Sequence, residues 1–347
     1  MHDFGLVPFF TQQVADIELE QGRLGRVIEV QRSQCIVVSG GSERAVKLSL
    51  SLQKERAVDR PTVGDWVVLD SALSNVDKVL ERKSLFKRLA AGVSTEIQLI
   101  AANIDTVFIV SSCNEEFKES RLERYLTLCG ESGAVPVIVL TKIDVADEPE
   151  RFVDRARKVQ ANVPVEMVNA LDSSSLDGVR AWISDNSTVA LVGSSGVGKS
   201  TLLNALAGHN LAATQEIRVQ DKKGRHTTTH RALHKLPTGG LLIDVPGMRE
   251  LKVADIDQSL ATVFEDVESL AALCQFTNCS HQSEPGCAVL QAIAAGELDE
   301  RRLNSYLKLG RENSLATRTL AEKRAKGREF AKVVKQAKSW KHRKSES

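Results

Sequence analysis

The sequence has no long apolar run and almost no net charge, and these two absences narrow the class of protein. No apolar stretch in the 347 residues approaches the roughly 20 residues that a membrane-spanning helix needs. The apolar first ten residues carry Asp3 and no basic stretch, which argues against a secretory signal. Apolar residues make up 42% of the chain and charged residues 26%, as in ordinary globular proteins. We therefore expect a cytoplasmic protein of two or three domains without a membrane partner.

The net charge of +1 hides an uneven distribution of basic residues. Residues 318–344 contain eleven lysines and arginines against two glutamates. A local basic segment of this kind favours an acidic partner surface. A basic helix is also often only a solvated face, so the segment alone leaves both interpretations open.

Cysteine is scarce, and three of the six cysteines fall within one short segment. Cys35, Cys113 and Cys129 lie in apolar stretches and are expected to be buried thiols. The other three form the pattern Cys-x4-Cys-x-His-x5-Cys, whose members are Cys274, Cys279, His281 and Cys287. Three sulfurs and one imidazole make a closed tetrahedral set, so we predict one structural zinc ion. The alternative is a group of free buried thiols.

The hydrophobic pattern changes twice along the chain and predicts three domains. Short β-like stretches from about residue 22 to 70 favour a small barrel such as an OB-fold, or another small β-domain. Strands then alternate with helical stretches, which indicates a doubly wound α/β domain, and the rest is largely helical. The strands expected in the α/β part lie at residues 106–111, 135–140, 165–168, 188–192 and 241–243. The predicted domains are residues 1–82, 83–252 and 253–347.

A phosphate-binding loop follows the predicted strand at residues 189–192. Its sequence, Gly193-Ser-Ser-Gly-Val-Gly-Lys-Ser200, fits G-x-x-x-x-G-K-S/T, and a helix-forming stretch begins at Thr201. The glycines let backbone N–H groups surround phosphate oxygens, and the helix N-terminus adds positive charge. We expect Lys199 on the β- and γ-phosphates and Ser200 on Mg2+. The predicted contacts are Gly193, Ser194, Ser195, Gly196, Val197, Gly198, Lys199, Ser200 and Thr201.

The tetrapeptide Thr141-Lys-Ile-Asp144 indicates that the nucleotide carries guanine. It follows a predicted strand and resembles the N/T-K-x-D motif of GTPases. The Asp144 carboxylate can accept hydrogen bonds from guanine N1–H and the 2-amino group, a donor pair that adenine lacks. An ATP-driven enzyme is the alternative that this carboxylate opposes. The turn after the next strand adds Asn169 and Ala170. The predicted base contacts are therefore Thr141, Lys142, Ile143, Asp144, Asn169 and Ala170.

The order of the motifs predicts a circularly permuted GTPase. Asp244-Val-Pro-Gly247 resembles D-x-x-G, in which Asp244 would hold Mg2+ through water and Gly247 would sense the γ-phosphate. In most GTPases the phosphate loop and D-x-x-G precede the guanine motifs, whereas here they follow them. A domain that is cut and rejoined keeps the same spatial set, because natural termini often lie close together.

The residue expected to position the attacking water is not the usual glutamine. Met248 stands directly after D-x-x-G, where Ras-like enzymes have a glutamine. The segment Gly224-Arg-His-Thr-Thr-Thr-His230 is the expected switch I, in which one threonine, chosen here as Thr228, would bind Mg2+. His226 is a candidate for orienting water, and the alternative is a solvated loop histidine.

Taken together, these motifs resemble the bacterial ribosome small-subunit-dependent GTPases, the circularly permuted RsgA/YjeQ family. The resemblance covers nearly the whole chain and depends on the motif order, Gly-Arg-His-Thr-Thr-Thr at 224–229, residues 244–247, the zinc set and residues 98–105. It implies an OB-fold, a GTPase domain and a zinc domain. By position it places guanine on Thr141, Lys142 and Asp144, phosphates on residues 193–201, and a catalytic histidine at 226. Thr141 departs from the commoner asparagine.

The resemblance also implies a function in late maturation of the small (30S) ribosomal subunit. GTP hydrolysis to GDP and phosphate would be stimulated by the subunit and coupled to release from it. The expected partners are the small subunit, its rRNA and GTP or GDP, and we expect a monomer. An OB-like barrel and a basic tail suit RNA binding. The alternative function is a GTP-gated rRNA-binding assembly module in which hydrolysis is incidental.

Overall fold

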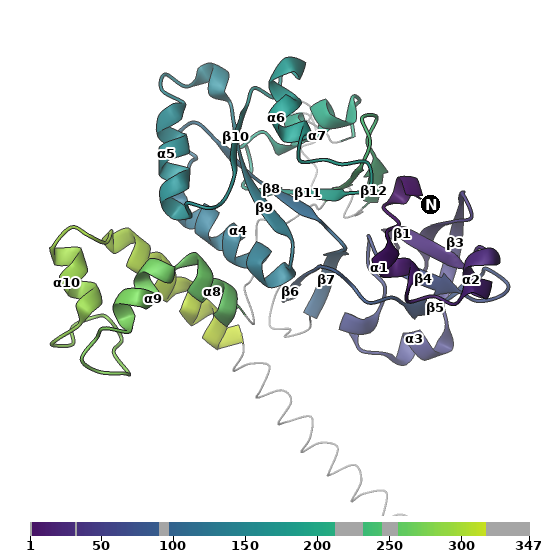
Figure 1. Cartoon of the computed structure of the whole chain (residues 1–347), viewed down its shortest axis with the longest axis horizontal. Coiled ribbons are helices and arrows are strands. Elements are labelled where there is room, and N and C mark those ends of the chain that lie inside the picture. The colour runs from purple at the N-terminus through teal and green to yellow at the C-terminus, as the bar shows by residue number, and fades with distance from the viewer. Residues whose placement is uncertain (1, 32, 90–96, 212–231, 245–255, 317–347) are drawn as a thin grey trace, which may run out of the picture.

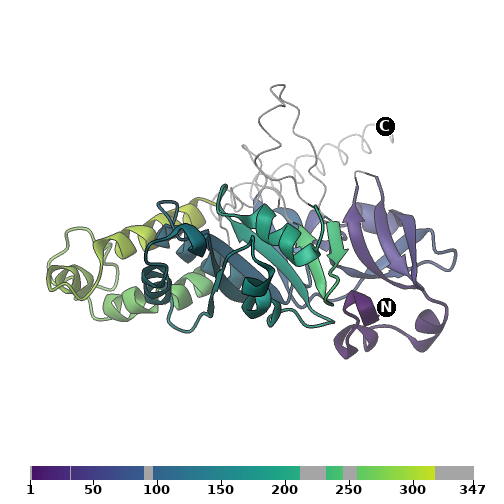
Figure 2. The same cartoon turned by 90° about the horizontal axis from the view of Figure 1, so that it is seen from above.

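The structure of the protein is a computed structural model, which describes residues 2–31, 33–89, 97–211, 232–244 and 256–316. Three parts of the chain follow one another along the long axis of the molecule (Figure 1). A β-barrel lies at one end, a sheet with flanking helices in the middle, and the C-terminal helices at the other end. The perpendicular view has the same order (Figure 2). The order in space thus matches the order in the sequence, while the domain boundaries themselves stay a prediction.

The barrel is closed by five strands, as the sequence pattern predicted. The strands run in the order β1-β2-β3-β5-β4, and β4 pairs back onto β1. All pairings are antiparallel except β3 with β5, so the arrangement is OB-like. The interior is filled by valines that alternate with outward residues, since side chains of a strand point to opposite faces. The elements are β1 (Leu24–Val30), β2 (Cys35–Ser39), β3 (Ser42–Leu48), α3 (Leu50–Lys54), η2 (Ala57–Asp59), β4 (Trp66–Leu69) and β5 (Asn75–Val79).

The first twenty residues, for which no structure was predicted, cover one side of the barrel. They form three short helices, η1 (His2–Phe4), α1 (Pro8–Thr11) and α2 (Asp16–Glu20). Phe10 is buried against Trp66, with ring centroids 5.6 Å apart. Lys235, which ends β12 of the central sheet, donates to Asp3 at 2.6 Å. The N-terminal segment therefore contacts both the barrel and the central sheet.

The central part is the predicted doubly wound α/β domain. Its strands run β10-β9-β8-β11-β13-β12 and are parallel except for β12. The strands are β8 (Thr106–Ser112), β9 (Val135–Thr141), β10 (Val165–Val168), β11 (Thr188–Gly193), β12 (Ala232–Lys235) and β13 (Leu241–Asp244). The connecting helices are α4 (Glu119–Ser132), η3 (Ile143–Val145), α5 (Glu150–Val159), η4 (Ser173–Leu176), α6 (Asp177–Arg180) and α7 (Lys199–Ala207).

Both faces of this sheet are buried, each by a different set of helices. Along β8, Val107 and Ile109 belong to the core under α4 and α5, whereas Phe108 and Val110 belong to the core under α6 and α7. The chain winds from β8 outward to β10 and then returns to place β11 on the other side of β8. The winding direction thus reverses between β8 and β11, which is where open α/β sheets bind ligands.

The barrel and the sheet are joined by a hairpin and by a strand pairing that the sequence did not predict. After the barrel, β6 (Leu85–Leu89) pairs with β7 (Ile97–Ala102). In addition, β1 meets β12 at Glu29 and Ala232, so barrel and sheet form one continuous array of strands.

A buried arginine fixes the barrel against the central domain. Arg26 of β1 is 1% exposed and donates to the backbone oxygen of Asn103 at 3.3 Å and to Thr188 Oγ1 at 3.1 Å. Burial lowers the pKa of its guanidinium to about 10. The Asn103 side chain in turn donates to the Gly64 carbonyl at 3.0 Å and accepts from the Lys83 N–H at 2.9 Å. These long-range bonds hold the two parts in one orientation.

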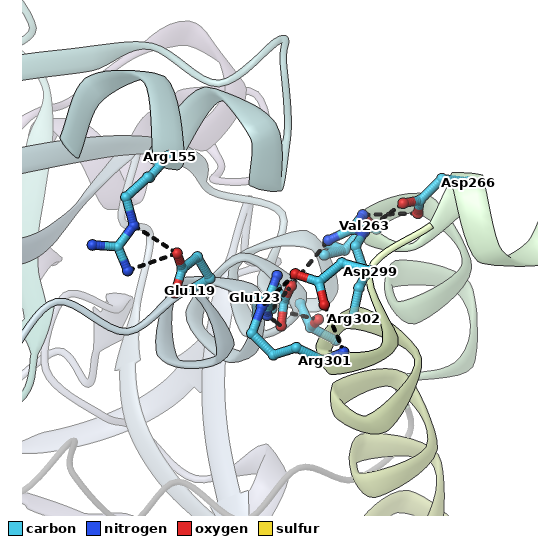
Figure 3. Close-up of polar contacts among 9 residues, drawn as sticks. Glu119, Glu123, Arg155, Val263, Asp266, Asp299, Arg301 and Arg302 are labelled. Carbon is cyan, nitrogen blue, oxygen red and sulfur yellow. Dashed lines mark hydrogen bonds and ion pairs between the residues drawn. The ribbon is translucent and has the colours of Figure 1, made fainter. Parts of the chain in front are cut away.

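The C-terminal helices pack on α4 through a shared apolar core and a buried ion network. The helices are α8 (Asp257–Val263), α9 (Glu265–Ala271), α10 (Ala288–Ala294) and a further helix at residues 300–316. The carboxylate of Glu123 on α4 is fully buried and accepts from Arg301 Nη1 at 3.0 Å and Arg302 Nη1 at 3.1 Å (Figure 3). Arg302 also donates to Asp266 at 2.5 and 2.8 Å. None of the helices in the described residues combines the length and apolar character needed to cross a membrane.

Candidate functional site

The predicted phosphate loop lies at the carboxyl end of β11, at the reversal point of the sheet. Gly196 and Gly198 adopt φ values of +79° and +90°, a left-handed region that residues with a Cβ seldom occupy. Helix α7 begins at Lys199, so its first N–H groups point into the loop. Lys199 Nζ donates to the Ser194 carbonyl, which folds the lysine back over the loop. The strand, glycine loop and helix therefore have the order that the motif predicted, an arrangement whose N–H groups can surround an anion.

Thr141 connects the phosphate loop to the guanine motif. It is 1% exposed, and its hydroxyl oxygen lies 2.5 Å from the Val197 carbonyl and 3.1 Å from the Ser111 carbonyl. A Cβ on Gly198 would lie 3.3 Å from the same hydroxyl, so the two segments are in close contact. The sequence suggested Thr141 as a contact to the base. In the structure its hydroxyl bonds to backbone oxygens of the protein, a contact between the two motifs that sequence reasoning missed.

The two guanine motifs lie side by side because their strands are neighbours. Val168, the last residue of β10, pairs with Thr141, the last residue of β9. Lys142 follows with a left-handed φ of +59°, and Asp144 is exposed to solvent in η3. Asn169 continues from β10, and its side-chain oxygen accepts from the Leu171 N–H at 3.0 Å. Residues predicted from segments 25 positions apart are thus brought to one edge of the sheet.

The remaining nucleotide motifs are only partly described. Asp244 ends β13, whose Ile243 pairs with Ala190 of β11, so D-x-x-G starts at the same sheet edge as the phosphate loop. Gly247, Thr228 and His226 lie outside the described residues.

The four predicted metal ligands form a separate cluster between α9 and α10. The three Sγ atoms and one imidazole nitrogen of Cys274, Cys279, His281 and Cys287 all lie within 4.8 Å of one another. Cys274 Sγ is 3.8 Å from Cys287 Sγ, and His281 Nδ1 is 3.6 and 3.5 Å from these two sulfurs. The cluster could hold a metal ion. The other three cysteines are buried single thiols, as expected.

The Cys274 and Cys279 thiols differ in pKa because their hydrogen-bond partners differ. Desolvation opposes ionisation of Cys274, but hydrogen bonds from the Val289 and Ala288 amides bring its pKa below the usual value. Desolvation and the neighbouring thiols raise the pKa of Cys279 to about 11. Three adjacent thiolates repel one another, so a bound cation would be needed for all three to ionise.

Comparison with known proteins shows the family of this chain. A model of the RsgA GTPase family matches residues 79–254. The small ribosomal subunit biogenesis GTPase RsgA 2 of Vibrio parahaemolyticus is 44% identical over 347 residues, which cover 100% of this chain and 95% of that protein. The chain belongs to the RsgA GTPase family. Another relative, the small ribosomal subunit biogenesis GTPase RsgA of Xanthomonas euvesicatoria, is 48% identical over 275 residues, covering 78% of this chain and 75% of that one.

Solved structures related to this RsgA family member have the same architecture. YjeQ from Thermotoga maritima has a TM-score of 0.60 and 26% identity, covering 83% of this chain and 96% of that one. YloQ, described as a circularly permuted GTPase, has a TM-score of 0.56 at 22% identity, covers 86% of this chain and 95% of that one, and is similar in fold alone. The predicted family and fold class, including the permuted order, are therefore confirmed.

Proposed function

We propose that this chain hydrolyses GTP to GDP and phosphate in late assembly of the small (30S) ribosomal subunit. The subunit stimulates hydrolysis, and hydrolysis is coupled to release of the protein from it. One observation carries the enzymatic part: the Thr141 hydroxyl lies 2.5 Å from the Val197 carbonyl and joins a guanine motif to a phosphate loop. The names of relatives that match along almost the whole chain support the ribosomal part.

The nucleotide would lie along the edge that β9, β10, β11 and β13 share. Lys199 would neutralise charge on the β- and γ-phosphates, and Ser200 would bind the Mg2+ that accompanies GTP. Asp144 would accept both guanine donors. The full proposed set is Thr141, Lys142, Ile143, Asp144, Asn169, Ala170, residues 193–201, Thr228, Asp244 and Gly247. His226 is proposed to orient the attacking water, and an unchanged stimulated rate in His226→Ala would exclude this role.

We propose zinc as the ion of the Cys/His cluster. A tetrahedron with bonds of about 2.3 Å to sulfur and about 2.05 Å to nitrogen has edges of about 3.8 Å between sulfurs and about 3.5 Å from sulfur to nitrogen. The observed separations are 3.8 Å between Cys274 and Cys287 and 3.5 Å from Cys287 to His281. All four positions of such a site are taken by the protein, which favours a structural function over catalysis.

The domains at residues 1–82, 83–252 and 253–347 would divide the function. The OB-like barrel and the basic residues at 318–344 suit binding to rRNA, because they combine a nucleic-acid-binding fold with positive charge. The protein would act as a monomer in the cytoplasm.

The decisive experiment compares GTP hydrolysis with and without purified small subunits. The full chain should hydrolyse GTP slowly alone and faster with subunits, and Lys199→Ala should lose hydrolysis in both conditions. Large subunits serve as the matched control and should leave the rate unchanged. Binding to small subunits that depends on GTP but leaves hydrolysis unstimulated would instead support the GTP-gated binding module. Equal competition by ATP and GTP would contradict the guanine site.

A further inference from the structure

The four ligands of the metal cluster are held in two different ways. Cys274 follows α9, and its N–H donates to the Ala271 carbonyl at 3.2 Å. Cys287 precedes α10, and its Sγ accepts from the Leu290 N–H at 3.5 Å. These two sulfurs are fixed by helix ends. Cys279 and His281 lie in the intervening loop, which has no helix or strand to fix them.

One carboxylate gathers the backbone of this loop. Glu284 Oε1 accepts from the Ser280 N–H at 2.8 Å and from the Ser280 hydroxyl at 2.5 Å. Its Oε2 accepts from the N–H groups of Gln282 and Ser283 at 3.0 and 3.1 Å. Three backbone donors on both sides of His281 therefore converge on a single side chain.

The geometry of His281 depends on this turn. Its φ is +56°, a left-handed conformation that residues with a Cβ adopt uncommonly. In that conformation Nδ1 lies 3.6 Å from Cys274 Sγ and 3.5 Å from Cys287 Sγ. The hydrogen bonds of Glu284 on either side of His281 supply the constraint.

We propose that Glu284 is a positioning residue that holds the loop in its metal-binding shape before the ion arrives. Both carboxylate oxygens are engaged by loop donors, so Glu284 does not itself serve as a ligand. A carboxylate is needed because only this group offers acceptors at both ends, whereas a glutamine amide would turn an N–H donor toward backbone N–H groups. Without Glu284 the metal-free loop would relax, and the ion would have to order it again.

The test is a Co2+ titration of the full-length metal-free protein, followed by its absorption spectrum. The wild-type chain should give the spectrum of a tetrahedral site with three thiolates and one imidazole. Glu284→Gln should give the same spectrum, with an affinity lower by about 10- to 100-fold, the range found when residues that orient metal ligands are changed. Glu297→Gln is the matched control, since Glu297 is an exposed carboxylate in the same region.

A second variant distinguishes the loss of positioning from a folding defect in Glu284→Gln. Glu284→Asp keeps the charge and both oxygens on a shorter side chain, so its Co2+ affinity should lie between those of the wild type and Glu284→Gln. Circular dichroism of the metal-free proteins checks that the helices are retained. An affinity of Glu284→Asp outside this interval would contradict the proposal.

The role of Glu284 rests on the metal site proposed above, and the same titration separates the two. If the wild-type chain binds no Co2+, the metal site itself is wrong. If the wild type binds and Glu284→Gln binds within about twofold of Glu297→Gln, only the positioning role is wrong. A changed spectrum in Glu284→Gln would place the carboxylate among the ligands and would also overturn the proposal.

Discussion

The buried ion network between α4 and the C-terminal helices makes a quantitative prediction about Arg302. This side chain is only 9% exposed and donates to Glu123, Asp266 and the Val263 carbonyl. These partners raise its pKa above the usual value in spite of desolvation, so the guanidinium is charged where it lies. Its loss would leave the fully buried Glu123 carboxylate with Arg301 as its remaining partner in the network.

Arg302→Met removes the charge but keeps most of the apolar stem. Breaking a buried ion pair from one side costs about 3–5 kcal/mol, and here the buried Glu123 carboxylate would depend on the partly exposed Arg301 to compensate its charge. Arg301→Met is the matched control, since Arg301 bonds to the same carboxylate from a side chain that is 36% exposed. We expect it to cost about 1 kcal/mol or less. The double variant Glu123→Leu with Arg302→Met leaves no buried charge and should recover most of the loss.

Hydrogen exchange followed by mass spectrometry measures this cost locally, which suits a chain of several domains. Amides of α8, α9 and the helix at residues 300–316 should exchange on the order of 10²- to 10³-fold faster in Arg302→Met, since about 1.4 kcal/mol corresponds to tenfold. Barrel amides should be unaffected and serve as an internal standard. A change below about fivefold, or a double variant that loses the sum of both single effects, would refute the reasoning.

Three further predictions concern the nucleotide edge and the barrel. Thr141→Val removes the hydroxyl bonded to the Val197 carbonyl, so GTP should bind about 3- to 10-fold more weakly in a fluorescent-nucleotide titration, with the fold unchanged by circular dichroism. Asp144→Asn should weaken GTP by about 100-fold or more and favour xanthosine triphosphate in a competition assay, because the amide donates where the carboxylate accepts. Hydrogen bonds, foremost from the Asn75 side chain, lower the pKa of Asp70 to about 2 from its usual 3.8. The ionised form thus stabilises the turn between β4 and β5 above about pH 4, and this contribution should disappear as the pH falls toward 2. In urea unfolding at a series of pH values, Asp70→Asn should reduce the change of the unfolding free energy with pH over this range.

The nucleotide and metal motifs were predictable because each is local in the chain. The phosphate loop is a strand, a glycine turn and a helix within about twenty residues, and the Cys/His set spans fourteen. Residue type at a fixed spacing is enough to specify such sites. The two guanine motifs needed one further step, that parallel neighbouring strands end at the same edge.

Long-range contacts were beyond sequence reasoning. Glu123 lies among polar residues of α4 and would be expected in solvent, yet it is fully buried because Arg301 and Arg302 approach from 178 and 179 residues away. Arg26 is buried in the same way against Thr188, 162 residues along the chain. The residues around a charged side chain in the sequence do not reveal which distant residue will compensate its charge.

Short patterns in the amino-acid sequence were enough to predict the family, the permuted order of the motifs and the residues proposed for both candidate sites, since the chemistry of such patterns is independent of the surroundings. Three contacts became visible only in the folded chain: the Thr141 hydroxyl joins the guanine motif to the phosphate loop, β1 of the barrel extends the central sheet at β12, and Glu284 accepts hydrogen bonds from the metal loop. The first two contacts join segments that are far apart in the sequence, at distances set by the packing of buried side chains, which no local pattern encodes. The Glu284 contacts are local, but they depend on the backbone conformation of the loop, which the residue types alone do not specify.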